Sequence, residues 1–173
     1  TVGVSADSAL SNSIMQQGKQ KIQLYNQMAQ ILVGHDATGS IREFDADGDL
    51  SSGAKFKDAF FFNFSRLLIK DEIQKGTFRM NFSVDPTGSY SQAAPTTRVL
   101  VIEDQSGSNS FKTISPAGEY GILYVTSSQS GTLNTPLADN SGHPCGLVYY
   151  QAGIAVLTSS LFKTVASGGL LGR

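Results

Sequence analysis

The chain has 173 residues, which is enough for one domain with its own core, or for one domain plus an appendage. Charged residues make up only 16% and the formal net charge is −1, which argues against a nonspecific nucleic-acid binder. The single cysteine excludes an internal disulfide, and no apolar run is long enough to span a bilayer.

The first predicted element is a long helix that follows a loose arm of residues 1–6. Asp7 or Ser8 can cap its start, and Gly34 is a typical C-terminal cap just beyond its predicted end at Leu32. We therefore divide the chain into an N-terminal arm and helix, 1–34, and one β-rich unit, 35–173. Because the chain starts with Thr1 and shows no signal-peptide pattern, we expect a processed chain or a piece of a longer polypeptide.

An apolar stripe runs along the predicted helix and can serve either of two purposes. Leu10, Ile14 and Leu24 are the candidate interface residues, and Met28 and Ile31 continue the stripe. The helix can pack on a neighbouring subunit, as in a coiled-coil seam, or on the sheet of its own domain. We favour packing on its own sheet, and the partner remains an alternative because the polar first half of the helix has little to bury locally.

The densest apolar stretch follows a polar loop that contains one short predicted strand, Ser40–Phe44. Phe60–Phe64 predicts a buried strand, residues 67–74 predict a short amphipathic helix that ends at Gly76, and Thr77–Val84 alternates as a half-buried strand. We expect the apolar face of that last strand to be buried; its members are Phe78, Met80 and Phe82.

The second half of the chain predicts further short strands with tight connections. The predicted segments are Arg98–Glu103 and Phe111–Ile114 as a hairpin around 105–109, Glu119–Thr126, a long loop at 127–144, a hairpin of Leu147–Tyr150 with Ile154–Thr158, and a last helix Leu161–Ala166. In total the sequence predicts a mainly β (α+β) fold: an antiparallel β domain of about seven strands, with a long N-terminal helix and a short helix between two core strands.

Alternating carboxylates at Asp45, Asp47 and Asp49 are the clearest chemical motif. A calcium-binding loop begins in this way, because the cation takes several oxygen ligands. The sixth position is Leu50 instead of Gly, and the twelfth is Phe56 instead of Glu. The sequence therefore leaves a noncanonical calcium site open beside a solvated acidic turn, and it predicts no other cofactor.

Two further motifs offer weaker chemistry. His143 and Cys145 lie two residues apart, but a zinc site needs more ligands and no flanking motif supports a nucleophilic Cys–His pair, so we expect Cys145 to be a small buried apolar residue. Tyr149 and Tyr150 can form an aromatic platform for a sugar, although neighbouring strand residues point to opposite faces and one of them is expected in the core.

Three segments together resemble modules of the large virion structural proteins of contractile-tailed myoviruses, especially those of cyanophages. They read YNQMAQILVGHDATGSIREFDADGD, FKDAFFFNFSRLLIKDEIQKGTFRMNF and GLVYYQAGIAVLTSSLF, and the resemblance runs from about Tyr25 to Phe162. It implies a bacteriophage particle component in the capsid, tail or baseplate, and it carries no catalytic residues over to this chain.

The expected function is that of a non-enzymatic virion structural protein, located in the virion. Such a protein assembles with copies of itself as a homo-oligomer, or with other virion proteins. The alternative, from a different class, is a receptor- or glycan-binding module of a tail fibre that contacts a host surface receptor. That alternative predicts an exposed aromatic cluster in the region 127–150.

Overall fold

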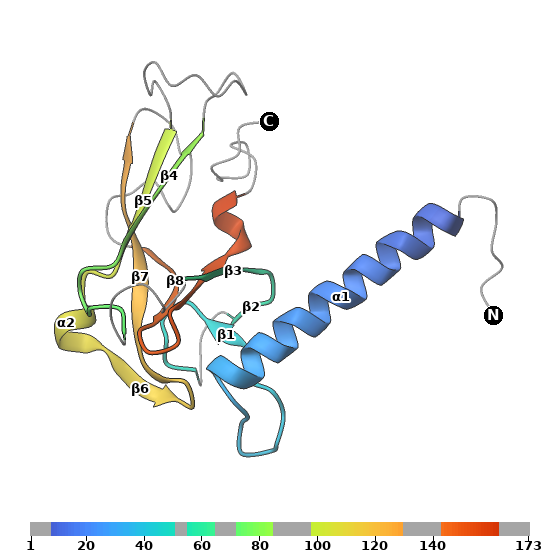
Figure 1. Cartoon of the computed structure of the whole chain (residues 1–173), viewed down its shortest axis with the longest axis horizontal. Helices are drawn as coiled ribbons and strands as arrows, with labels where there is room; N and C mark the ends of the chain where they lie inside the picture. Colours follow the sequence, from blue (N-terminus) through green and yellow to red (C-terminus); the bar gives the residue numbers. More distant parts are fainter. Residues whose placement is uncertain (1–7, 51–54, 65–71, 85–97, 130–142, 163–173) are drawn as a thin grey trace.

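The computed structural model describes residues 8–50, 55–64, 72–84, 98–129 and 143–162 (Figure 1). Within them the chain is mainly antiparallel β with one long helix, which confirms the predicted fold class. In chain order the elements are α1 (Ser8–Leu32), β1 (Phe44–Asp45), β2 (Lys55–Phe56), β3 (Ala59–Asn63), β4 (Arg79–Val84), β5 (Arg98–Glu103), α2 (Gly107–Ser110), β6 (Lys112–Ser115), β7 (Gly118–Gln129), β8 (His143–Tyr149), β9 (Ile154–Thr158) and the 3₁₀ helix η1 (Ser159–Phe162).

The main sheet has seven strands, of which six follow the order β3-β9-β8-β7-β5-β4, while β6 pairs with β7. A separate small sheet joins β1 to β2, and every strand pair is antiparallel. The predicted hairpin of β5 with β6 is wrong, because β5 pairs with β4 and β7. The predicted hairpin of β8 and β9 is confirmed, and Gly153 in its turn adopts a left-handed φ of 67°.

The sheet curls so that its two edge strands, β3 and β4, approach each other. The rings of Phe62 and Phe82 lie 5.6 Å apart between centroids, and those of Phe64 and Phe78 lie 5.4 Å apart. Among the described residues no backbone pairing joins these two strands. Aromatic contacts therefore bring the edges together where a ladder of hydrogen bonds is absent.

Side chains along each strand alternate between the two faces of the sheet, so each face has a hydrophobic core of its own. The inner core, enclosed by the curl, contains Ile102, Leu123, Val125, Cys145, Val148, Tyr150, Ala155, Leu157 and Leu161. The helix-side core contains Ala29, Leu32, Val33, Phe44, Leu50, Phe56, Tyr120, Ile122, Leu147, Tyr149 and Val156. Phe78, Met80 and Phe82 pack against the inner core but remain half-buried, so the prediction of full burial was too strong.

Two predicted helices differ from the observed chain. Residues 72–76 form a bend and a turn, so the described end of the predicted helix 67–74 is not helical; residues 65–71 lie outside the described residues. The Ile73 amide donates instead to the Tyr150 carbonyl at 3.0 Å, and Gly76 adopts a φ of 75° in the turn. The last helix is the single 3₁₀ turn η1, and the rest of its predicted span lies outside the described part of the chain.

The two predicted polar loops have different bounds in the structure. The predicted strand Ser40–Phe44 reduces to a bridge between His35 and Ile41, followed by β1. The predicted loop 127–144 loses its first residues to β7 and its last to β8, while residues 130–142 are not described.

The helix α1 ends as predicted at Leu32, and only its C-terminal end meets the β domain (Figure 1). The amide of Gly34, with a φ of 75°, donates to the Ala29 carbonyl at 2.9 Å, which closes the helix in a left-handed cap. No helix in the described ranges is long and apolar enough to cross a membrane.

Candidate interaction surface

The anchor of α1 is Tyr25, a half-buried side chain whose two ends bind different parts of the domain. Its hydroxyl donates to the Phe56 carbonyl at 2.9 Å and accepts from the Phe44 amide at 3.1 Å. Its ring lies edge-on to Phe44 at 5.4 Å and near Phe61 at 6.5 Å. Burial raises the pKa of the Tyr25 hydroxyl, so it remains a neutral donor and acceptor at physiological pH. One side chain thus ties the helix to both strands of the small sheet.

The last turns of α1 complete this anchor. Ala29, Leu32 and Val33 are fully or almost fully buried in the helix-side core. The Ser115 hydroxyl donates to the Leu32 carbonyl, which would otherwise have no partner within the helix. The C-terminal end of the helix is therefore fixed to the domain by apolar packing and by a hydrogen bond to β6.

The turns of α1 that precede this anchor have exposed side chains, over the residues whose side chains the structure describes. Every described side chain from Gln17 to Leu24 is solvent-exposed. Ile22 is 62% exposed and Leu24 is 52% exposed, and further along Ile31 is 61% exposed. Leu24 was predicted as an interface residue and is available for that role, while the side chains of Leu10 and Ile14 lie outside the described set.

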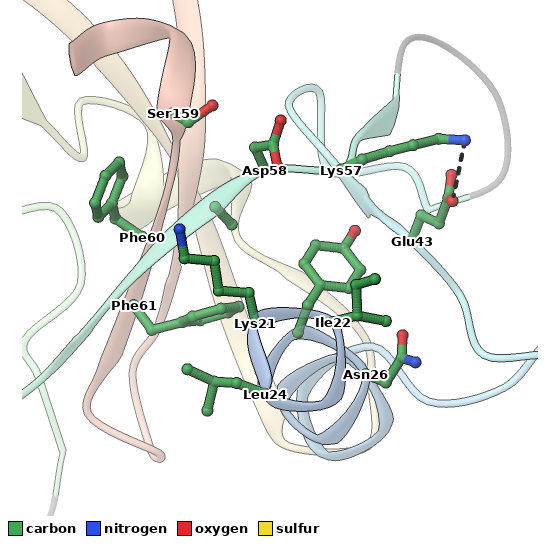
Figure 2. Close-up of a pocket in the computed structure, with 12 residues that line it drawn as sticks. Lys21, Ile22, Leu24, Asn26, Glu43, Lys57, Asp58, Phe60, Phe61 and Ser159 are labelled. Carbon is green, nitrogen blue, oxygen red and sulfur yellow. Dashed lines mark ion pairs between the residues drawn. The ribbon is translucent and has the colours of Figure 1, made fainter. Parts of the chain in front are cut away.

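A groove of about 490 Å³ lies between α1 and β3 (Figure 2). Its apolar floor and flanks come from both elements, including Leu24 on the helix and Phe60 and Phe61 on the strand. Lys21 rises from the helix into the groove, and Asp58 lies on the opposite wall. Sequence reasoning missed this groove, because its two walls come from α1 and β3, which are far apart in sequence, and the periodicity of each element is local.

Charged groups occur on both walls of the groove. The Lys57 ammonium lies 3.7 Å from the Glu43 carboxylate at the far end, and both groups remain well exposed. Among the described residues, neither Lys21 nor Asp58 has an ion-pair partner. The groove therefore offers an apolar strip flanked by a cation and an anion that remain available to a partner.

The three predicted calcium ligands do come together. The ligand oxygens of Asp45, Asp47 and Asp49 lie within 4.8 Å of one another, and Leu50 has a φ of 59° at the loop position that usually needs Gly. Two observations weigh against an ion. The Lys55 ammonium pairs with the buried Asp45 carboxylate, and Phe56 at the twelfth position is a core residue.

Burial and local hydrogen bonds explain the electrostatics of this loop. Burial raises the pKa of Asp45, and the ion pair with Lys55 only partly offsets that effect. The amide of Asp47 donates to Asp45, and the Tyr120 hydroxyl donates to the Gly48 carbonyl at 2.7 Å. The loop is thus closed by contacts within the chain, and a calcium ion there remains a prediction.

Cys145, Tyr149 and Tyr150, from the two weaker chemical motifs, are all buried. Cys145 is fully buried, its thiol contacts the Leu123 carbonyl at 3.3 Å, and burial raises its pKa to about 12, so a nucleophilic thiolate is disfavoured. His143 lies in β8, and its side chain is not described. Tyr149 and Tyr150 are both fully buried, one in each core, so the sugar platform predicted on them is wrong.

A buried polar cluster that the sequence did not indicate lies at the end of β5. Asp104 is 1% exposed, and its Oδ2 accepts from the Tyr150 hydroxyl at 2.7 Å and from the Gly76 amide at 2.9 Å. A Cβ on Gly107 or Gly121 would overlap this pair. The lack of space for a ligand indicates a structural role: the cluster joins β5, the turn at 72–76 and the end of β8.

Comparisons with known proteins returned nothing that identifies the chain. No family model, no curated protein and no solved structure matches it. The class that the fold itself defines is a mainly antiparallel β domain with a helix projecting from it.

Proposed function

We propose that this chain is a non-enzymatic structural component of a virus particle, and that it assembles through α1. The observation that carries the proposal is that α1 has an anchored C-terminal end and, before it, exposed side chains over the described residues 17–24. Tyr25, Ala29 and Leu32 fix the helix to the domain, whereas Leu24 and Ile22 are more than half exposed. A projecting helix with exposed apolar side chains is costly for an isolated domain and useful for a subunit that packs on its neighbours.

Helix energetics support the same proposal. Most of the stability of a helix in a protein comes from packing of its apolar face, because nucleation is unfavourable and propensity alone is weak. The N-terminal half of α1 contains Gly18 and several Ser, Asn and Gln residues, and its first turn carries no acidic residue that would favour the helix dipole. A partner that packs on this half supplies the stabilisation that its own domain does not.

Surface composition and the sequence resemblance agree with an assembling particle protein. A net charge of −1 gives copies little electrostatic repulsion. The resemblance to virion structural proteins of contractile-tailed myoviruses supplies the location, the virion, and the partners: copies of the chain or other particle proteins.

The test is to search for the chain in purified particles of the virus whose genome encodes it. Peptide mass spectrometry of gradient-purified particles should detect it at a fixed ratio to the major structural proteins, and antibody labelling should locate it in the particle. A tagged variant that lacks residues 8–24 should be lost from particles although its β domain still folds. If the chain is absent from purified particles, or if that variant is incorporated normally, the proposal fails.

A further inference from the structure

Five described side chains of α1 follow the spacing of a coiled coil; four of them are exposed, and the fifth, Met28, is half-buried against the helix-side core. Gln17, Lys21, Leu24, Met28 and Ile31 are separated by alternating steps of four and three residues, which is the heptad spacing of the a and d positions. Leu24 and Ile31 in this series are 52% and 61% exposed, although both are large and apolar. The sequence continues the same steps towards the N-terminus at Ile14 and Leu10, within the span of α1.

From this spacing we infer that the groove between α1 and β3 receives the α1 helix of a second copy, parallel and in register. The inference rests on the proposed function and names the partner. A seam with a heptad repeat is complementary to another copy of itself, since each a or d side chain fits between four residues of the facing helix. The seam residues Leu24 and Ile31, together with Phe60 on the groove wall, would then be covered.

The charged side chains at the groove favour a second copy as the partner and a parallel direction for its helix. Among the described residues of α1 the only charged side chains are Lys19 and Lys21, and the helix contains no acidic residue, so two such helices need anions from elsewhere. Asp58 lines the same groove as Lys21 and has no ion-pair partner among the described residues. In a parallel, in-register pair, Lys21 of one copy lies at the height of Asp58 of the other. An antiparallel helix does not preserve that match unless the helices cross at Lys21.

Lys21 also sets the register. It occupies an a position of the seam, where a single polar residue reduces stability but fixes the alignment of the helices. A shift by one heptad would place Lys21 against apolar layers and remove its contact with Asp58. The long apolar stem of the lysine can lie along the seam while its ammonium reaches the neighbouring carboxylate.

The first test compares two exposed residues of α1 in the full chain. Wild-type protein should show concentration-dependent dimers or higher oligomers in sedimentation velocity. Leu24→Glu places a charge in the seam and should weaken association by about 100-fold or more, because a buried charge without a partner is costly. Gln23→Glu adds the same charge at an exposed site of α1 that lies outside the a and d positions and does not line the groove, and it should leave association within about threefold of wild type.

A second test determines direction. Variants with one added cysteine, Leu24→Cys and Ile31→Cys, should each form a disulfide with a second copy of the same variant under mild oxidation, because a parallel, in-register pair brings both positions together. An antiparallel pair allows at most one of them. The native Cys145 is fully buried with a raised pKa and should not react. Asp58→Lys should weaken association, and the double variant Lys21→Glu with Asp58→Lys should recover it.

Several outcomes overturn the inference, and they are distinct from failure of the proposed function. A wild-type chain that stays monomeric up to sub-millimolar concentration excludes self-pairing; if it is nevertheless found in particles, the occupant of the groove is another particle protein. Equal effects of Leu24→Glu and Gln23→Glu exclude the seam. Crosslinking at only one cysteine excludes the parallel register. If the pair forms as predicted but the chain is absent from particles, the proposed function fails and the interface stands.

Discussion

The rings of Phe62 and Phe82 pack 5.6 Å apart, although their strands stand at opposite ends of the sheet order. This contact is where the curl of the sheet closes, and Phe162 from η1 joins it with a ring 5.4 Å from Phe82. Because no hydrogen-bonded pairing joins β3 to β4 among the described residues, aromatic packing substitutes for it. The inner core depends on this closure, since both rings cover it.

Removal of either ring should therefore destabilise the domain. Both rings are half-buried, so we expect Phe62→Ala and Phe82→Ala each to lower the free energy of unfolding by about 2–3 kcal/mol, below the cost at a fully buried site. The double variant should lose less than the sum, with a coupling of about 0.5–1.5 kcal/mol. Urea unfolding of the four chains measures this cycle.

The control for this cycle is Ile114→Ala on β6. Ile114 is 54% exposed and lies outside both cores, so its loss should change the unfolding free energy by less than about 0.5 kcal/mol and should not couple to Phe82→Ala. Strict additivity of Phe62→Ala and Phe82→Ala would show that the two edges do not support each other.

Tyr149, at the end of β8, and Tyr150, in the turn that follows, should differ in how loss of the hydroxyl group changes the stability of the protein. The Tyr150 hydroxyl donates to the buried Asp104 carboxylate, so Tyr150→Phe should cost about 2–3 kcal/mol, as for a hydrogen bond to a charged group. The Tyr149 hydroxyl is buried without a hydrogen-bond partner in the described part of the chain, so Tyr149→Phe should be neutral or stabilising. Thermal melts of both variants test this pair, and a Tyr150→Phe variant as stable as wild type would contradict the assignment of the Asp104 cluster as structural.

Local patterns in the sequence predicted the elements well where one face was apolar. Strict alternation located β4, a short apolar run located β5, and Gly34 marked the end of α1. The contact between Phe62 and Phe82 could not be predicted, because the curl of a sheet depends on how all its strands pack. Phe82 is partly exposed because β4 lies at the edge of the sheet, and an edge strand buries its side chains less than a central strand does.

Pairing errors and missed polar contacts also have physical causes. The β5–β6 hairpin was a reasonable prediction from a short polar turn, but the buried Asp104 and the helical turn α2 separate the two strands, so that β6 pairs with β7. The Asp104–Tyr150 bond joins residues 46 positions apart and has no periodic signal. The groove at Lys21 and Asp58 likewise depends on tertiary packing, whereas the acidic loop was visible because its three carboxylates are close in sequence.

Alkaline pH should destabilise the protein through its buried tyrosines. Burial raises the pKa of Tyr120 from 10.0 to about 12, so the folded state disfavours the tyrosinate. A raised pKa of this acid stabilises the folded state fully below pH 10, and that contribution is lost as the pH rises from 10 to 12. The loss is roughly 2–3 kcal/mol for Tyr120 alone, at about 1.4 kcal/mol per pH unit.

Tyr120→Phe separates this titration from ordinary packing. At neutral pH the variant should be about 1 kcal/mol less stable than wild type, because it loses the hydrogen bond to Gly48. Above pH 10 its stability should fall less steeply, so the two curves converge or cross. Denaturant unfolding at a series of alkaline pH values measures both curves, and parallel curves would contradict a raised pKa at Tyr120.

Calcium should stabilise the acidic loop of Asp45, Asp47 and Asp49 only when the Lys55 side chain is removed. In the wild-type chain Lys55 neutralises the buried Asp45, so we expect neither chelation nor added calcium to shift the melting temperature. Lys55→Met should lower the unfolding free energy by about 3 kcal/mol, because it leaves a buried carboxylate without its charge partner. Millimolar calcium should then restore part of that loss, since the oxygens of Asp45, Asp47 and Asp49 already lie within 4.8 Å of one another.

Lys57→Met is the matched control, because Lys57 is exposed and pairs only weakly with Glu43. A fall in the melting temperature of the wild-type chain on chelation would instead establish a native calcium site in this loop.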